Sequence, residues 1–389
     1  MPKAGLRRMA ALDPRSAHRV SSPLELLFDL VFVVAVSQAS STLHHLIVDD
    51  HIGQGVLAYL MVFFSVWWAW MNFTWFASAY DTDDWLYRVM TIAQMGGVLV
   101  LAAGVQSAML DFDFSTVTLG YVIMRLAMVG QWLRLAISDP ASRPTAVRFA
   151  IGISAVQVLW VARLATDDVV QFWSFFVLMI AEFAVPLWAE HGRPTPWHPH
   201  HIAERFGLFT LILLGESLLA SANAMIDALS EGEHVGELLG LAASGIVITA
   251  TIWWIYFSRE QAHRLRTPRD GFTFGYFHYV LFAAVGAVSA GVEVEIDDVA
   301  GVAHISGAAA GLALTLPLAI FLVTVWAVLL RHAVSVVASA IVLVAAVLVA
   351  LGGLLPIGEY VLAAVLMAGV VVAIEVDAAR RSRRPAGHG

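Results

Sequence analysis

The sequence of 389 residues contains no cysteine and few charged side chains. The missing cysteines exclude disulfide bonds, thiolate metal sites and cysteine nucleophiles, and they leave the redox compartment undetermined. Charged residues make up 13% of the chain, against about 25% in a typical soluble domain, while 59% of the residues are hydrophobic. This composition is typical of an integral membrane protein, so the lipid bilayer is the first partner that we expect.

A basic surface and the common catalytic motifs are missing as well. The net charge of −8 argues against a nucleic-acid partner. No hydrolase elbow, zincin, P-loop, Rossmann or haem-attachment motif occurs, so we assign no catalytic residue, cofactor or metal. The D-x-D-D segment from Asp81 lacks the glycine and final glutamate of a calcium loop, and we expect a polar turn that braces Arg88. The W-H-P-H-H segment is interrupted by Pro199 and has no fourth ligand nearby, so we interpret it as a loop.

Apolar runs of roughly 20 residues, long enough for a helix to cross a bilayer, recur along the whole chain. The first follows a basic tail and is too long for a signal-peptide core, so we expect it to stay as a membrane helix. We count about twelve, although the fifth is short and the tenth contains Pro317: 23–43, 53–77, 88–110, 115–137, 148–165, 171–190, 202–224, 237–258, 274–293, 304–330, 334–354 and 357–377. The predicted fold is an all-α, polytopic membrane bundle.

Basic and acidic residues alternate on the segments between these runs. With the N-terminus inside, nearly all of the 22 Lys and Arg residues fall on cytoplasmic segments. The opposite loops carry acidic pairs such as Asp49–Asp50 and Asp297–Asp298. By the positive-inside rule, we expect a multi-pass protein of the cell membrane with both termini in the cytoplasm.

The two halves of the chain share short motifs in the same order. They are E-L-L-F and E-R-F-G at Glu25 and Glu204, Trp-Trp at 67–68 and 253–254, and A-G-V-Q and A-G-V-E ending at Gln106 and Glu293. Their nearly constant offset predicts two parallel six-helix repeats, at 23–190 and 202–377. A cytoplasmic linker at 191–201 separates them, and basic cytoplasmic tails at 1–22 and 378–389 flank them.

Ionisable residues inside the apolar runs are the best functional candidates. A charge at mid-bilayer costs about 2.5–3.5 kcal/mol, so it usually faces a cavity or a partner. Glu216 is the clearest case, since it lies roughly 18 Å along a helix from Glu204. Asp29 lies one turn beyond Glu25, which can itself complete a capping box with Ser22. The alternative for Glu216 is a structural ion pair or a protonated, hydrogen-bonded carboxyl.

Arg125 is a cation in the fourth run, and Asp29, Glu216 or Glu182 could neutralise it. His278 is either a proton-handling group or a hydrogen-bonded core residue. The full set of predicted substrate- or ion-binding residues is Asp29, Glu216, Arg125, His278, Glu25, Glu204, Asn72 and Glu293. The solute or ion itself is not evident from the sequence, and a second copy of the chain is a candidate partner.

Three segments carry a family resemblance: "ELLFDLVFVVAVSQAS", "WWAWMNFTWFASAYDTDDW" and "ERFGLFTLILLGESLL". With them the chain resembles the bacterial low temperature requirement A family over nearly its whole length. The resemblance implies a multi-pass membrane protein linked to growth in the cold, and it supplies no catalytic residue. A fainter likeness to two-repeat cation channels rests on F-D-L-V-F from Phe28, but the second repeat has Gly207 where phenylalanine would be expected.

Three hypotheses about function follow. The first is a transporter or channel for a proton, a small cation or an amphipathic solute, which uses mid-membrane carboxylates. The second is a membrane-embedded enzyme for a lipid substrate, with Asp29, Glu216 and His278 as acid–base groups. The third is a structural or stress-adaptation protein without turnover. We favour transport, because no metal or nucleophile motif supports an enzyme. A water-accessible cavity open to one face and lined by Asp29 and Glu216 would favour transport, whereas a lateral slot open to lipid would favour an enzyme.

Overall fold

The computed structural model describes residues 6–14, 19–231, 234–355 and 358–383. Within these ranges every regular element is a helix and no strand occurs. Eleven helices are long and apolar enough to cross a membrane, and α12 is a shorter apolar helix of 17 residues. The prediction of an all-α membrane bundle is therefore confirmed, and about twelve spans remain compatible with the structure.

The helices follow the predicted apolar runs closely. They are α1 (Pro23–Val48), α2 (Ile52–Tyr80), α3 (Trp85–Ala103), α4 (Val105–Leu110), α5 (Ser115–Ser138), α6 (Arg143–Arg163), α7 (Asp168–Ala189), α8 (Pro199–Glu231), α9 (Val235–Phe257), α10 (Pro268–Val299), α11 (Gly307–Val325), α12 (Val336–Gly352) and α13 (Glu359–Ser382). Two further short helical elements are the 3₁₀ turn η1 (Ala262–Arg264) and the π turn η2 (Trp326–Leu330). The third run is divided into α3 and α4 at Gly104. The W-H-P-H-H segment is not entirely a loop, because α8 begins at Pro199.

The chain forms two compact units. Unit 1 comprises Met1–Ala39 and Met61–Phe206, and unit 2 comprises Ser40–Leu60 and Gly207–Gly389, with only the described residues considered in each. The helices α1, α2 and α8 therefore contribute to both units. This division assigns 40–60 to the second unit, whereas the sequence repeats begin at 23 and 202; the duplication itself stays a prediction.

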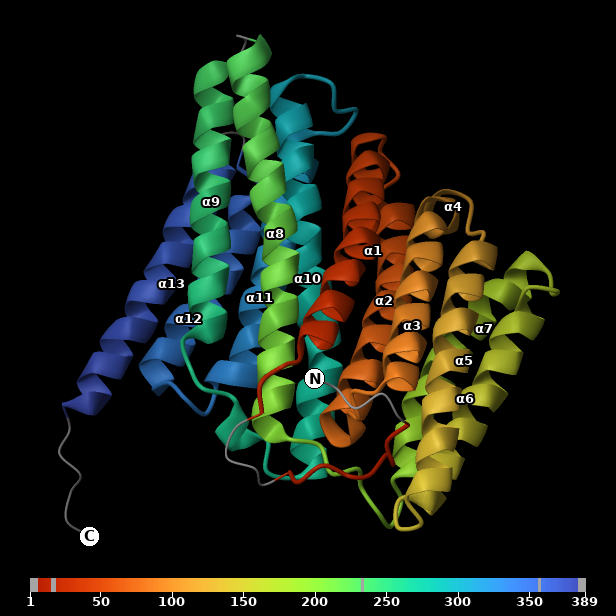
Figure 1. The fold of residues 1–389 in the computed structure, drawn as a ribbon. Helices are drawn as coiled ribbons and strands as arrows, with labels where there is room; N and C mark the ends of the chain where they lie inside the picture. Colours follow the sequence, from red (N-terminus) through yellow and green to blue (C-terminus); the bar gives the residue numbers. More distant parts are fainter. Residues whose placement is uncertain (1–5, 15–18, 232–233, 356–357, 384–389) are drawn as a thin grey trace. The chain divides into compact units, whose positions relative to one another are not determined.

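In unit 1, α3, α5, α6 and α7 pack in succession, as the orange-to-yellow helices of Figure 1 show. Glycine permits the closest of these contacts. A Cβ atom on Gly120 would lie 2.4 Å from the backbone nitrogen of Leu101, so α3 and α5 touch through their backbones. The later part of α2 supplies the aromatic core of the unit, since Trp67, Trp68 and Trp70 are fully buried.

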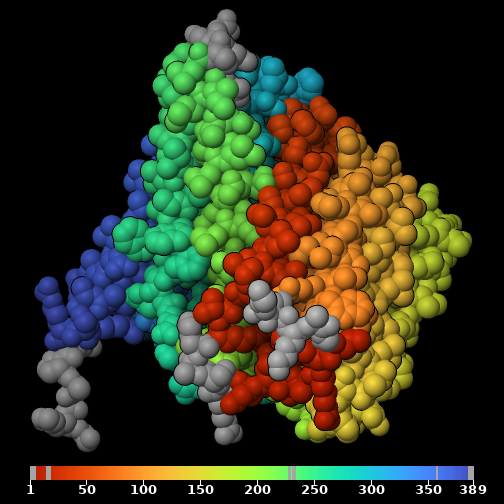
Figure 2. All heavy atoms as spheres, in the orientation of Figure 1, coloured from red at the N-terminus to blue at the C-terminus, as the bar shows by residue number. Residues whose placement is uncertain are grey.

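In unit 2, α10, α11, α12 and α13 pack in succession, and α9 packs on α13. A Cβ atom on Gly291 would lie 2.6 Å from the carbonyl oxygen of Ala313, so α10 and α11 are also in backbone contact. The tryptophan pairs of the two sequence halves differ in environment. Trp253 and Trp254 are 46% and 47% exposed, because α9 forms part of the outer surface of its unit (Figure 2).

Candidate functional site

A fully buried arginine connects α1 and α8 within unit 1. Arg205 donates from Nε to Asp29 Oδ2 at 2.9 Å and from Nη2 to Asp29 Oδ1, and its Nη1 lies 3.1 Å from Glu25 Oε1. Trp70 donates from Nε1 to Asp29 Oδ1 at 2.7 Å. None of the three charged residues is more than 1% exposed. The two carboxylates that stand one helical turn apart in the sequence therefore meet one guanidinium.

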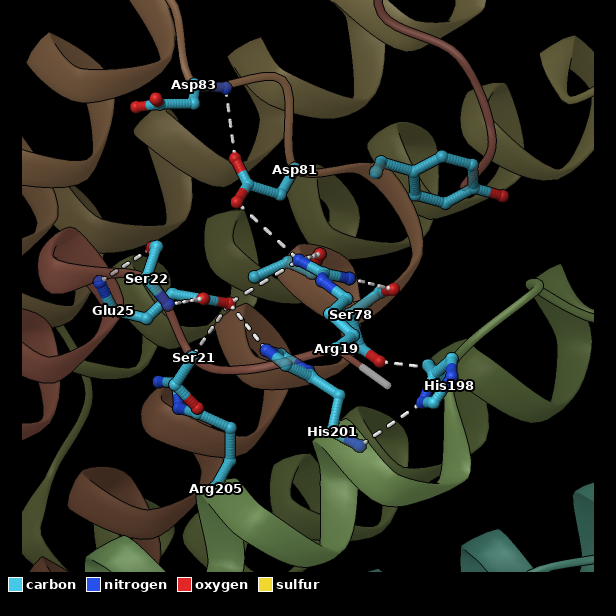
Figure 3. Close-up of polar contacts among 12 residues, drawn as sticks. Arg19, Ser21, Ser22, Glu25, Ser78, Asp81, Asp83, His198, His201 and Arg205 are labelled. Atoms are coloured by element: carbon cyan, nitrogen blue, oxygen red, sulfur yellow. Dashed lines mark hydrogen bonds and ion pairs between the residues drawn. The ribbon is translucent and has the colours of Figure 1, made fainter. Parts of the chain in front are cut away.

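Glu25 is both a helix cap and a member of this cluster. The backbone nitrogen of Ser22 donates to Glu25 Oε2 at 2.7 Å, and Ser22 Oγ accepts from the backbone nitrogen of Glu25 at 3.3 Å, which confirms the predicted capping box. Nε2 of His201, on the first turn of α8, lies 3.0 Å from Glu25 Oε1. Figure 3 shows Glu25 directed toward both Ser22 and His201.

Arg19 extends the cluster toward the end of α2. Its Nη2 lies 3.8 Å from Glu25 Oε1 and 3.5 Å from Asp81 Oδ2, and it donates to the carbonyl of Ala77 at 2.9 Å (Figure 3). Asp81 comes directly after the membrane helix α2. Burial raises the pKa of its carboxyl group to about 6; the negative charge of Glu25 raises this pKa further, and the positive charge of Arg19 lowers it. Glu204 lies at the edge, where its Oε1 accepts from the backbone nitrogen of Ser21 at 3.1 Å. We call Arg19, Glu25, Asp29, His201 and Arg205 the arginine cluster.

Arg125 has its partner on α7. Its Nη2 donates to Glu182 Oε2 at 3.1 Å and also contacts the hydroxyl of Tyr121. Glu182 accepts further hydrogen bonds from Trp68 Nε1 at 2.8 Å, Tyr121 Oη at 3.0 Å and Trp160 Nε1 at 3.2 Å. Among the three partners that the sequence left open, the structure therefore has Glu182.

A second set of ionisable side chains lies close together in unit 2. His44, near the end of α1, has Nε2 2.7 Å from Asp297 Oδ2 and Nδ1 3.4 Å from Glu293 Oε2, so the ring bridges two carboxylates of α10. Glu216 on α8 is half-buried and interacts electrostatically with Glu293. The Glu293 and Asp297 side chains are each 27% exposed, whereas that of His44 is 11% exposed. These four residues form the histidine cluster, which unites two of the predicted site residues, Glu216 and Glu293.

The other two predicted residues make contacts within the helical core. His278 is fully buried, with Nδ1 2.6 Å from the carbonyl oxygen of Phe274 and Nε2 3.1 Å from the hydroxyl of Tyr256. Asn72 donates from Nδ2 to the carbonyl of Trp68, one turn earlier in α2, at 2.7 Å. These are the contacts expected of core residues, and a functional role for either stays a prediction.

One further pair of carboxyl groups lies in unit 2. Glu295 on α10 and Glu359 at the start of α13 are 2% and 8% exposed, and their carboxyl groups interact electrostatically. Glu295 was not predicted, since it lies two residues beyond Glu293, where the predicted apolar run of 274–293 ends.

An apolar cavity of about 520 Å³ also lies in unit 2, with walls from α1, α2, α10 and α11. Its two hydroxyl groups are used within the protein, since Tyr59 donates to the carbonyl of Ala283 at 2.9 Å and Tyr279 to that of Leu60 at 2.8 Å. Neither Asp29 nor Glu216 lines it. The cavity therefore does not have the Asp29 and Glu216 lining that would favour transport.

Sequence reasoning missed Arg205, His201 and His44 as site residues. Arg205 lies within E-R-F-G, where it was counted as a cytoplasmic basic residue, and His201 was assigned to a loop. His44 stands beside His45 at the end of the first apolar run. A histidine or arginine within one turn of an apolar run was the available signal in all three cases. The predicted contact of Arg88 with the D-x-D-D turn is confirmed, since its Nε donates to Asp83 Oδ1 at 2.8 Å.

The comparison with protein families agrees with the fold, and it covers the histidine cluster and all of the arginine cluster except Arg19. The family model described as Bacterial low temperature requirement A protein (LtrA) matches residues 20–375. The chain belongs to the bacterial low temperature requirement A family. This LtrA-family chain is also 28% identical over 289 residues to the uncharacterized protein RA0937 of Rhizobium meliloti (strain 1021), a match that covers 67% of each chain. Membership in the LtrA family, together with the apolar helices, supports a multi-pass membrane protein.

Proposed function

We propose that this LtrA-family protein moves protons or a small monovalent cation across the membrane, with the histidine cluster as its binding site. The observation that carries this proposal is the position of His44 between Glu293 and Asp297, with Glu216 close enough to act on Glu293. All four residues lie on helices long and apolar enough to cross a membrane.

The charges of the two clusters differ in kind. In the arginine cluster the cation that contacts Asp29 and Glu25 is the guanidinium of Arg205, a group that stays charged at physiological pH. In the histidine cluster the basic group is an imidazole, which, unlike a guanidinium, can exchange its proton readily. Two carboxyl groups contact His44 and a third, that of Glu216, acts on Glu293, so the species that this cluster attracts is a proton or a cation.

Partial exposure supports the same assignment. A transported ion has to reach its site, and the side chains of Glu293 and Asp297 are each 27% exposed. The carboxylates of the arginine cluster are buried, so they suit a structural role better.

The apolar cavity bears on the enzyme alternative. A lipid-modifying enzyme needs an acid or base beside its lipid site. The lining of the 520 Å³ cavity includes no aspartate, glutamate or histidine, and its tyrosine hydroxyls already donate to backbone carbonyls. Transport therefore fits the described groups better than chemistry on a lipid.

The test is ion flux in proteoliposomes that contain the purified protein. A pH-sensitive dye inside the vesicles reports proton movement driven by a potassium diffusion potential, and sodium and potassium gradients are tested in turn. We expect His44→Gln and Glu293→Gln to lower the flux by at least about tenfold, equivalent to about 1.4 kcal/mol of barrier. His45→Gln is the matched control, since His45 is the exposed neighbour on the same helix. Equal flux in empty vesicles and in vesicles with the protein would contradict the proposal.

A further inference from the structure

Unit 1 contains a smaller cavity between α5 and α6 that belongs to neither cluster. It has a volume of about 300 Å³, and most of its walls are valine and leucine side chains. Three polar residues also line it: Arg125 from α5, and Ser154 and Gln157 from α6. Leu126 and Val158 in the walls are 63% and 66% exposed, so the cavity lies next to the lipid-facing surface of these membrane helices.

Two of these polar side chains have hydrogen-bonding atoms with no partner among the residues that the structure describes. Arg125 uses Nη2 for Glu182 and Tyr121, but its Nε and Nη1 are buried without an acceptor among the described residues. Gln157 is 7% exposed, and neither its Nε2 nor its Oε1 finds a partner in that same part of the chain. Buried donors and acceptors that stay unpaired are costly, and native proteins pair nearly all of them. Because these donors and acceptors belong to residues that line one cavity, a molecule bound in that cavity can supply the missing hydrogen-bond partners.

The charge of the site selects the kind of molecule that fits. Glu182 already balances Arg125 through a contact of 3.1 Å, so a carboxylate or phosphate would add an uncompensated negative charge inside the membrane. A neutral acceptor avoids that cost and still accepts from the guanidinium. The amide of Gln157 offers one more donor and an acceptor. The apolar walls suit a hydrocarbon portion, and the volume is at the lower end of the 300–1,000 Å³ that is typical of small-molecule sites.

We propose that this cavity binds a neutral, lipid-soluble molecule through a carbonyl group, which accepts hydrogen bonds from Arg125 and Gln157. A quinone and the ester of a neutral lipid both present such a carbonyl on an apolar body. The site is independent of transport, because its residues belong to unit 1 and none of them is part of the histidine cluster. The protein binds the carbonyl compound whether or not it conducts ions.

The test is thermal unfolding of the purified protein in detergent with three additives of similar size: a short-chain alkyl quinone, a short-chain diacylglycerol and n-decane. The first two carry carbonyl groups, and the alkane controls for simple filling of apolar space. We expect at least one carbonyl compound to raise the melting temperature by a few degrees, while n-decane does not. The compound that raises the melting temperature shows whether the bound carbonyl group belongs to a quinone or to a lipid ester.

Two variants locate the effect. Gln157→Leu removes the amide, so it should abolish most of the shift and slightly raise the melting temperature without additive, because two unpaired buried atoms disappear. Val158→Trp fills the cavity from its exposed wall and should abolish the shift with the polar groups intact. Gln106→Leu, at an exposed glutamine of α4, is the control that should keep the full shift. Equal shifts with n-decane and the carbonyl compounds, no shift at all, or full shifts in both variants would each overturn the proposal.

Discussion

Arg205 holds Asp29 through two parallel hydrogen bonds, with Nε to Oδ2 at 2.9 Å and Nη2 to Oδ1, and neither residue is more than 1% exposed. This bidentate arrangement sets the orientation of both side chains as well as their distance. Because Asp29 lies on α1 and Arg205 on α8, the pair connects the first helix of unit 1 to a helix that is distant in the sequence. A buried pair of this kind costs much when one partner is lost and little when both are replaced.

The first prediction concerns this pair. Asp29→Asn should lower the free energy of unfolding by on the order of 3 kcal/mol, because Arg205 keeps only Glu25 as a buried anion. Arg205→Met should have a similar effect, since it leaves two buried carboxylates. The double variant should lose clearly less than the sum of the two. Reversible unfolding in mixed micelles measures all three.

The exposed pair of Arg88 and Asp83 provides the matched control, with side chains 45% and 48% exposed. Arg88→Gln should leave the unfolding curve unchanged, since surface pairs contribute little. Strict additivity at Asp29 and Arg205 would show that the two side chains do not interact in the folded protein.

The second prediction concerns Arg125 and Glu182. Glu182→Gln keeps one acceptor oxygen, which can replace either Oε2, the acceptor of Trp68, or Oε1, the acceptor of Trp160, and it leaves the Arg125 charge unbalanced. We expect a loss of about 3–5 kcal/mol. Adding Arg125→Met should restore most of it, because the stranded charge is then gone. If the second substitution makes the protein still less stable, Arg125 has a partner other than Glu182.

The sequence predicts the helices much better than the clusters. A membrane helix has to be apolar over roughly 20 residues, so its position is visible in local composition. The capping box of Ser22 and Glu25 was predictable for the same reason, since its residues are three positions apart. The contact of His44 with Asp297 joins residues 253 positions apart, and no local pattern contains it. Arg205 was misread because the positive-inside rule counts basic residues near helix ends without asking whether they are buried.

The third prediction is a pH dependence at Glu190, the residue that ends α7 outside the membrane span. Burial raises its pKa from the ordinary value of 4.5 to about 7, although Thr195 donates to it and opposes the rise. A carboxyl with a raised pKa in the folded chain stabilises the fold below its unfolded pKa. That contribution is lost as the pH rises through 7.

Glu190→Gln removes the loss of stability at high pH, since the amide resembles the protonated carboxyl group and its oxygen can still accept a hydrogen bond from Thr195. The variant should match the parent at about pH 5 and exceed its stability by roughly 1–3 kcal/mol at about pH 9. Thermal unfolding across this range is the measurement. Asp168→Asn, at an exposed position on α7, should show no such difference. A variant that is less stable than the parent at high pH would show that the charged carboxylate is favoured.

The fourth prediction is the orientation of the chain, which rests on the positive-inside rule. The absence of native cysteine allows single cysteines to be placed freely. A membrane-impermeant maleimide should label His51→Cys on intact cells and Arg266→Cys only after permeabilisation, and both positions are exposed. The reverse pattern would place the termini outside the cell.

The last prediction concerns Glu216, which is half-buried on α8 and interacts electrostatically with Glu293. If Glu216 takes part in ion transport, Glu216→Gln should give a folded protein whose flux falls by about tenfold, because the amide keeps the shape but carries no titratable charge. A structural ion pair would instead predict lower thermal stability. Arg125 is not the cation of such a pair, because it is paired with Glu182.

Removing the charge should even relieve repulsion between Glu216 and Glu293 when both are ionised, so the melting temperature of Glu216→Gln should equal or exceed that of the parent. Flux and melting temperature are measured on the same preparation, with Glu237→Gln, at an exposed position of α9, as the control. A Glu216→Gln protein with unchanged flux has no transport role at this position. One with a lowered melting temperature and unchanged flux would assign Glu216 to the packing of unit 2.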